Sequence, residues 1–142
     1  MRIALGTDER TPLVDEVAAF LGEDGHDVVL VADGDPWPET GAKVGHAVVD
    51  GSADVGIVCC TTGTGVSIAA NKVAGARAAL CTDAETARGA RRWNDANVLA
   101  FGLRLTSPAV AREMVDAFLS TPFDRAEAEL VAAVEPSAGP AR

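Results

Sequence analysis

A cysteine followed by a glycine-rich loop is the feature of this sequence best suited to chemistry. Cys60 follows an apolar segment and begins the run Cys-Thr-Thr-Gly-Thr-Gly at residues 60–65. Gly63 and Gly65 allow the backbone to turn sharply and expose N–H groups at the start of a helix. Such a group of donors suits a phosphate, a carboxylate or a developing enolate oxygen. The same positive helix end favours a thiolate at Cys60 that abstracts a proton.

Two nucleotide-binding patterns match this loop poorly. A P-loop closes with Gly-Lys-Ser/Thr, whereas Lys72 lies well into the following helix. A dinucleotide-binding loop follows the first strand and has a third glycine where this chain has Ile68, although Asp83 lies about 20 residues further on. From the residues alone, a structural turn and a ligand site are equally good interpretations of residues 60–65.

The remaining cysteines and both histidines are expected to be structural. Alternation along a strand points Cys59 away from Cys60 and into the core. Cys81 is expected to be a small buried hydrophobic residue. His26 is expected in a solvated turn, and His46 on a helix surface or in a dimer contact. Three cysteines without the Cys/His spacing of zinc ligands predict neither a disulfide framework nor a metal site.

Short apolar runs alternate with amphipathic stretches along the chain, which predicts an α/β fold. This alternation implies a parallel sheet with helices on both faces. We expect a Rossmann-like three-layer sandwich with five strands in the order 2-1-3-4-5. The expected strands are 3–7, 27–31, 55–59, 77–81 and 98–101. The expected helices are 14–21, 42–49, a segment ending at 71, 84–92, 108–119 and 126–134.

The expected fold brings two reactive side chains to one place. In doubly wound sheets, ligands bind beyond the carboxyl ends of the strands, where the strand order reverses. In the expected order this point lies between strands one and three. Asp8 ends the first strand and Cys60 ends the third. Both side chains are therefore predicted to face the same crevice.

Length, composition and charge narrow the function classes. A chain of 142 residues suits a single domain, 1–142, with about residues 136–142 as a flexible tail. Its formal net charge of −9 argues against nucleic acid as a partner, because binding the phosphate backbone requires a basic surface. A small phosphorylated substrate remains compatible with this charge, since a few arginines and a helix N-terminus can bind one phosphate.

The chain is also expected to have no membrane partner. No apolar stretch approaches the roughly 20 residues of a membrane helix. The first residues run directly into an apparent strand rather than into a signal peptide. We therefore expect a cytoplasmic protein.

Three motifs resemble the type B ribose-5-phosphate isomerase and galactose-6-phosphate isomerase family (RpiB/LacAB). They are residues 6–8, 60–72 and 94–102, with Arg104 shortly afterwards, and the resemblance covers about residues 2–123. It implies a homodimer with shared active sites, with a tetramer as the alternative assembly, and a C-terminal helix used in dimerisation. It also implies aldose–ketose isomerisation of a small sugar or sugar phosphate through an enediolate, without metal or cofactor.

The resemblance assigns roles to individual residues. It makes Cys60 the base that moves a proton between adjacent carbons, and Asp8 a ligand of sugar hydroxyls. Asn94, supplied by the second subunit, contacts the intermediate, and Arg104 matches a phosphate-binding arginine. Thr62 helps to hold the enediolate oxygen. The amides that hold it with Thr62 belong to Gly63, Thr64, Gly65, Val66 and Ser67.

Several family residues are replaced in this sequence. Glu9 stands where the family usually has His, Trp37 where it has Tyr, and Trp93 where it has the ring-opening His. The Arg-His pattern with a second Arg that clasps phosphate is absent from residues 125–130. Glu9, Trp37 and Trp93 are expected to line the substrate site. The two tryptophans either stack on a sugar face or simply pack in the dimer interface.

These replacements predict an isomerase whose substrate differs from ribose 5-phosphate. The proton-transfer residues are present, while the ring-opening acid and most phosphate ligands are missing, which favours an open-chain, short or non-phosphorylated sugar. A non-catalytic sugar-binding homologue and a recruited enzyme of other enolate chemistry are the alternatives. Arg88, Arg91 and Arg92 are expected on a solvated helix face, unless one of them replaces a missing phosphate ligand across the dimer.

Overall fold

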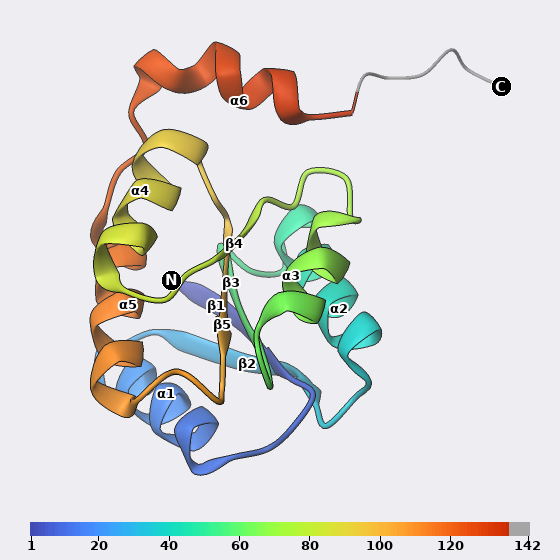
Figure 1. Cartoon of the computed structure of the whole chain (residues 1–142), viewed down its shortest axis with the longest axis vertical. Helices are drawn as coiled ribbons and strands as arrows, with labels where there is room; N and C mark the ends of the chain where they lie inside the picture. Colours follow the sequence, from blue (N-terminus) through green and yellow to red (C-terminus); the bar gives the residue numbers. More distant parts are fainter. Residues whose placement is uncertain (137–142) are drawn as a thin grey trace, which may run out of the picture.

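Five parallel strands form the middle layer of the molecule (Figure 1). They are β1 (Arg2–Thr7), β2 (Asp27–Asp33), β3 (Val55–Cys60), β4 (Ala78–Leu80) and β5 (Val98–Gly102). The computed structural model describes residues 1–136 and gives the strand order β2-β1-β3-β5-β4. Helices cover both faces of this sheet, which confirms the predicted three-layer α/β fold.

The predicted strand order 2-1-3-4-5 is wrong at one edge, because β5 lies between β3 and β4. β5 is buried along its whole length, whereas none of the three residues of β4 is fully buried. A buried apolar strand gains most in the middle of a sheet, while a short strand is tolerated at an edge. The order still reverses between β1 and β3, so the predicted crevice keeps its place.

The helices form two groups, one on each face of the sheet. They are α1 (Pro12–Glu23), α2 (Trp37–Val49), α3 (Thr64–Asn71), α4 (Ala84–Asn94), α5 (Pro108–Ser120), the short 3-10 helix η1 (Arg125–Glu127) and α6 (Ala128–Val134). Buried side chains of α1, α4 and α5 make one core with the sheet, and those of α2 and α3 make the other. Alternate residues of β3 enter different cores, Cys59 the first and Cys60 the second.

Two helices differ most from their predicted bounds. α2 begins at Trp37 rather than near residue 42, because a proline such as Pro38 is tolerated in the first turn of a helix. The predicted helix 126–134 is divided into η1 and α6. α6 lies at one end of the molecule, beyond α4, and its Leu130 and Val134 side chains are exposed (Figure 1).

The remaining expectations about the chain concern its tail and its environment. Apart from Pro136, the predicted flexible tail lies outside the described residues. The assignment of residues 1–142 to one domain stays a prediction. Within residues 1–136, every helix is too short or too polar to cross a bilayer.

β4 is an edge strand, and the side chain of Asn71 occupies part of its free edge. The carbonyl of Arg77 accepts a hydrogen bond from the Val98 N–H at 3.2 Å, so the alternate residue Ala78 presents its backbone outward. The Ala78 N–H donates to Asn71 Oδ1 at 2.8 Å, and Asn71 Nδ2 donates to the Ala78 carbonyl at 2.9 Å. Asn71 therefore pairs with Ala78 as a neighbouring strand would.

Candidate active site

Asp8 and Cys60 lie at neighbouring strand ends, as predicted. Cys60 is the last residue of β3, and Asp8 follows β1 directly. Thr7 pairs with Cys59 across the two strands, and the Asp8 N–H donates to the Cys59 carbonyl at 3.4 Å. Both residues lie at the carboxyl ends of their strands, beside the point where the strand order reverses.

The two adjacent cysteines have different environments. Cys59 is fully buried, and this burial raises the pKa of its thiol to about 12. Its Sγ donates to the Gly6 carbonyl at 3.7 Å, so Cys59 is a neutral core residue. Cys81 is also buried, which raises the pKa of its thiol to about 11. Cys60, on the opposite face of β3 from Cys59, is 5% exposed and packs on the side of α2 and α3.

The loop after Cys60 packs backbone against backbone on the end of β5. Gly63 has a φ of +78°, and a Cβ built there would lie 2.6 Å from the Phe101 carbonyl carbon. A Cβ on Gly102 would likewise lie 2.8 Å from the Thr62 carbonyl group. Side chains larger than hydrogen do not fit at either position. The two glycines therefore allow the loop to lie directly on β5.

Hydrogen bonds between main-chain groups fix this loop to the segment that follows β5. The Leu103 N–H donates to the Cys60 carbonyl at 2.8 Å, and the Arg104 N–H donates to the Thr61 carbonyl at 3.0 Å. The Arg104 side chain is exposed. The structure thus brings the backbone of Arg104 beside the cysteine loop.

The N-terminus of α3 presents free backbone donors next to Cys60. Gly63 is the residue before the helix, and no side chain within residues 1–136 caps it. The Ser67 N–H donates to the Gly63 carbonyl at 3.2 Å, which leaves the amides of the first turn, Thr64 to Val66, outside the intrahelical pattern. These N–H groups carry the positive end of the helix dipole. They are three of the five amides predicted to hold an enediolate oxygen, whereas the Ser67 amide is bound within the helix.

A hollow of about 230 Å³ opens beside the loop. The hydroxyl groups of Thr62 and Thr64 lie on its wall and are 3.3 Å apart. Its remaining lining residues come from β4, β5 and the segments that follow them. These residues are Leu80, Cys81, Thr82, Gly102, Leu105 and Thr106.

Trp37 stands against the same loop. A Cβ built on Gly65 would lie 2.9 Å from Cδ2 and Cε3 of the indole, so the ring rests directly on the glycine backbone. The side chain is 46% exposed, although it belongs to the first turn of α2. Trp37 is therefore close to the helix N-terminus, as expected of a residue that lines the site.

Asp8 has a carboxylate oxygen without a partner. Its Oδ1 is buried and accepts no hydrogen bond from residues 1–136. Burial, with the charge of Glu9 as a smaller cause, raises the pKa of the Asp8 carboxyl. A buried acceptor left unpaired costs about 1–3 kcal/mol. A sugar hydroxyl that donates to this oxygen would remove that cost.

Glu9 is held beside Asp8 by a short turn. The buried Thr7 hydroxyl donates to the Glu9 carbonyl at 2.6 Å, and the Glu9 N–H donates back to Thr7 Oγ1 at 3.2 Å. The Glu9 side chain is exposed. Thr7 was given no role of its own from the sequence, although it lies in the family motif at residues 6–8, which is the signal that could have indicated it.

Asn94 and Trp93 lie away from Cys60 within one chain. Asn94 ends α4 and precedes Val98, the first residue of β5, whereas Cys60 pairs with Gly102 at the other end of that strand. A strand rises about 3.3 Å per residue, so the two ends of β5 are roughly 13 Å apart. Asn94 therefore lies at the amino ends of the strands, whereas Cys60 lies at their carboxyl ends.

Trp93 and Asn94 line a different hollow, of about 470 Å³, between α4, β4 and α6. Trp93 is 55% exposed, and its ring lies on the backbone of Gly89, where a Cβ would be 2.9 Å from Cζ3. Leu130, Val131 and Val134 of α6 form the apolar wall of this hollow.

Arg77 and Arg91 lie beside the predicted site residue Asn94, a place that the sequence did not indicate for Arg77. Both side chains are about four-fifths buried and bind Asp95, the residue after Asn94. The prediction of a solvated helix face is therefore wrong for Arg91. Arg77 and Asp95 are 18 positions apart, and no motif in the sequence indicates that they meet.

Comparisons with known proteins agree with this geometry. The model of the protein family described as Ribose/Galactose Isomerase matches residues 3–133 of this chain. Ribose-5-phosphate isomerase B of Escherichia coli (strain K12) is 39% identical over 128 residues, which cover 87% of this chain and 86% of that protein. D-erythrulose-4-phosphate isomerase of Pectobacterium atrosepticum is 42% identical over 88 residues, 62% of this chain and 58% of that protein. The solved ribose-5-phosphate isomerase B of Clostridium thermocellum has a TM-score of 0.87 and 40% identity, covering 94% of this chain and 95% of its own.

Proposed function

Because this chain belongs to the ribose/galactose isomerase family and is a sugar phosphate isomerase, we propose that it interconverts an aldose and a ketose with Cys60 as the base. One observation carries the proposal: the β3 end at Cys60 leads directly into the uncapped N-terminus of α3. A proton acceptor and a set of oxyanion donors are therefore contiguous in the chain.

The reaction follows from this arrangement. The Cys60 thiolate takes the proton from the carbon next to the substrate carbonyl, and the electron pair moves to the carbonyl oxygen. Thr62 and the loop amides stabilise the negative oxygen of the resulting enediolate. After a proton moves between the two oxygens, the Cys60 thiol returns its proton to the neighbouring carbon. Asp8 Oδ1 accepts a hydrogen bond from a substrate hydroxyl.

The substrate that suits this site is a short sugar phosphate that is already open-chain. Trp93 replaces the ring-opening His of the family, and an indole N–H only donates hydrogen bonds, so it does not serve as a proton-transferring acid. A four-carbon sugar with phosphate on its terminal oxygen has no hydroxyl left to close a five-membered ring. The likeness to a D-erythrulose-4-phosphate isomerase supports the same substrate class. Exposed Arg104 would bind the phosphate.

The substrate proposal predicts a preference that can be measured directly. With D-erythrulose 4-phosphate in D₂O, we expect NMR to show the aldose product and deuterium on the adjacent carbon. For ribose 5-phosphate, kcat/KM should be about 100-fold lower, the lower end of what a missing general acid costs. Equal or faster turnover of ribose 5-phosphate would contradict the proposal. Turnover of none of the sugars, including unphosphorylated erythrulose, would favour a non-catalytic homologue.

We also propose that the active protein is a homodimer in which Asn94 and Trp93 complete the site of the second subunit. This proposal is supported by their position at the amino ends of the strands, away from Cys60 at the carboxyl ends. Leu130 and Val134 of α6 are 68% and 74% exposed, which suits a helix that packs against another subunit.

Mixing two inactive variants tests whether the site is shared. Cys60→Ala and Asn94→Ala should each lose activity, whereas refolding them together should form mixed dimers with one intact site. Random pairing makes half of the dimers mixed, so about a quarter of the wild-type activity should return. Each variant refolded alone serves as the control. Absence of recovery in dimers of confirmed mixed composition would show that Asn94 does not act across the interface.

A further inference from the structure

Asn94 is followed by a residue in a backbone conformation that its side chain disfavours. Asp95 has φ +46° and ψ +42°, and it is the one non-glycine residue with positive φ among residues 1–136. The Asp95 and Ala96 N–H groups both donate to the Ala90 carbonyl, that of Ala96 at 3.0 Å, so α4 ends in a left-handed turn at Asp95. Glycine usually occupies such a left-handed position, and aspartate is among the few other residues that adopt it, at a cost that further interactions can offset.

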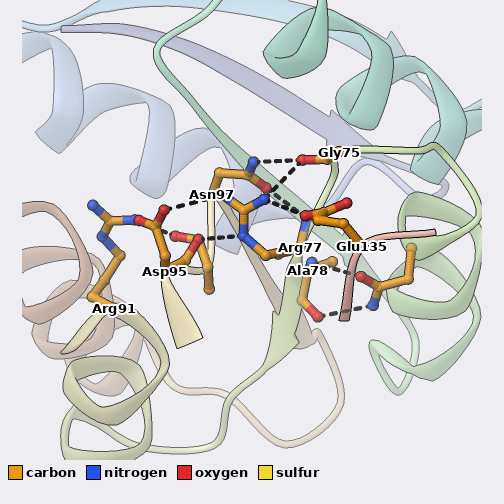
Figure 2. A network of polar contacts seen from close by, with 9 residues as sticks. Gly75, Arg77, Ala78, Arg91, Asp95, Asn97 and Glu135 are labelled. Carbon is orange, nitrogen blue, oxygen red and sulfur yellow. Dashed lines mark hydrogen bonds and ion pairs between the residues drawn. The ribbon is translucent and has the colours of Figure 1, made fainter. Parts of the chain in front are cut away.

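Two arginines supply these interactions (Figure 2). Arg77 donates through Nε to the Asp95 carbonyl at 2.8 Å and through Nη2 to Asp95 Oδ2 at 3.2 Å. Arg91 donates to Asp95 Oδ1 at 3.3 Å and also to the Ala96 carbonyl. The backbone and both carboxylate oxygens of Asp95 are therefore bound at once. The Arg77 and Arg91 side chains are only 22% and 20% exposed, which protects these bonds from solvent.

Arg77 is itself anchored on two other segments. Its N–H donates to Asn97 Oδ1 at 2.7 Å, and Asn97 Nδ2 donates to the Gly75 carbonyl at 2.9 Å. The Arg77 Nη1 donates to Oε1 of Glu135 at 2.6 Å, and Glu135 is the residue just after α6. Figure 2 shows Asp95 and Glu135 meeting at the Arg77 guanidinium, with Asn97 and Gly75 beside it. Asp95 is thus tied to the entry of β4, the entry of β5 and the C-terminal segment.

From this arrangement we infer that Arg77, with Asp95, is a positioning residue for Asn94; the inference rests on the proposed role of Asn94. The left-handed turn at Asp95 sets the direction in which the chain leaves α4. If Asp95 relaxes to an ordinary helical conformation, the last turn of α4 shifts against the sheet and carries Asn94 with it. Arg77 acts through Asn94 and does not itself touch substrate.

The test compares Arg77→Gln with Arg112→Gln in the full-length protein, using its best sugar phosphate substrate. Arg112 is a matched control, because it also binds two carboxylates, Asp24 at 2.7 Å and Asp116 at 3.1 Å. For Arg77→Gln we expect kcat to fall about 10- to 100-fold with KM nearly unchanged, the range for a displaced catalytic group. For Arg112→Gln we expect the kcat of the wild type, even if the melting temperature of this variant is lower. Arg77→Lys should recover part of the lost kcat.

A double variant separates positioning from stability alone. Added to Asn94→Ala, Arg77→Gln should cost nothing further, because the group that it positions is already gone. Losses that multiply, or an Arg77→Gln kcat equal to wild type, would overturn the inference and leave the proposed function intact. Full activity of Asn94→Ala would instead remove the proposed role of Asn94, and the inference with it.

A second substitution covers the case in which Arg77→Gln does not fold. Asp95→Asn keeps a residue that tolerates the left-handed conformation and loses only its charged contacts with both arginines. It should show a smaller kcat loss in the same direction, again with KM nearly unchanged. An unchanged kcat in folded Asp95→Asn would overturn the inference.

Discussion

Cys60→Ala should abolish proton exchange at the carbon next to the substrate carbonyl, with a loss of about 1,000-fold or more. General acid–base groups typically contribute 10²- to 10⁴-fold, and here one thiol both takes and returns the proton. The fold should survive, because the change removes a single sulfur atom at the end of β3. Deuterium incorporation from D₂O, followed by NMR and normalised to folded protein, measures the effect.

Cys59→Ala is the matched control for this experiment. Cys59 is the adjacent residue on the same strand, but it lies in the opposite core with its thiol pKa raised to about 12. Its removal should lower the free energy of unfolding by about 1–2 kcal/mol and change exchange less than about twofold. Equal losses in both variants would mean that Cys60 is a packing residue. Unchanged exchange in Cys60→Ala would exclude it as the base.

Gly63→Ala should have the second largest effect, because it disturbs the loop that holds the enediolate oxygen. The new methyl group would lie 2.6 Å from the Phe101 carbonyl carbon and 2.9 Å from the Gly102 nitrogen. These are backbone atoms, so relief requires β5 or the loop to move. The φ of +78° adds conformational strain. We expect a loss of about 3 kcal/mol or more in the free energy of unfolding, together with loss of turnover.

Gly51→Ala separates the clash from the backbone strain. Gly51 has a φ of +81°, but a Cβ there would meet nothing within 4 Å. Its substitution should therefore cost only about 1–2 kcal/mol and leave turnover unchanged. Chemical denaturation and the exchange assay measure both variants. If Gly63→Ala behaves like Gly51→Ala, the close packing of the loop on β5 has no part in catalysis.

Local patterns predicted the layers of the fold and much of the site. The alternation of short apolar runs with amphipathic stretches indicated the strands and the α-helices. The Cys60 loop is contiguous in sequence, so its position before α3 followed directly. The placement of β5 between β3 and β4 did not follow, because successive strands are neighbours by default and the sequence does not state which strand lies at the edge. The family resemblance implied that Asn94 acts from a second subunit, and the strand pairing agrees in separating Asn94 from Cys60 within one chain.

The two ion pairs of Asp95, one local (i,i+4) and one between distant segments, were missed for a different reason. Arg91 lies in an arginine-rich helix that resembles a solvated surface, yet its partner Asp95 folds back on the next turn. Arg77 meets Asp95 through tertiary contacts between segments that have no common motif. The sequence does not distinguish an arginine that faces water from one that binds a partly buried carboxylate, because tertiary packing determines which of the two occurs.

The amide of Asn71 also limits how copies of this chain can grow into larger assemblies. With both outward backbone groups of Ala78 occupied, β4 offers too little free edge to template a strand from another molecule. Copies that meet along this edge must recognise each other through side chains rather than through a continuous sheet. Asn71 thereby hinders strand addition at the β4 edge of the sheet, whereas it has no contact with β2 at the other edge.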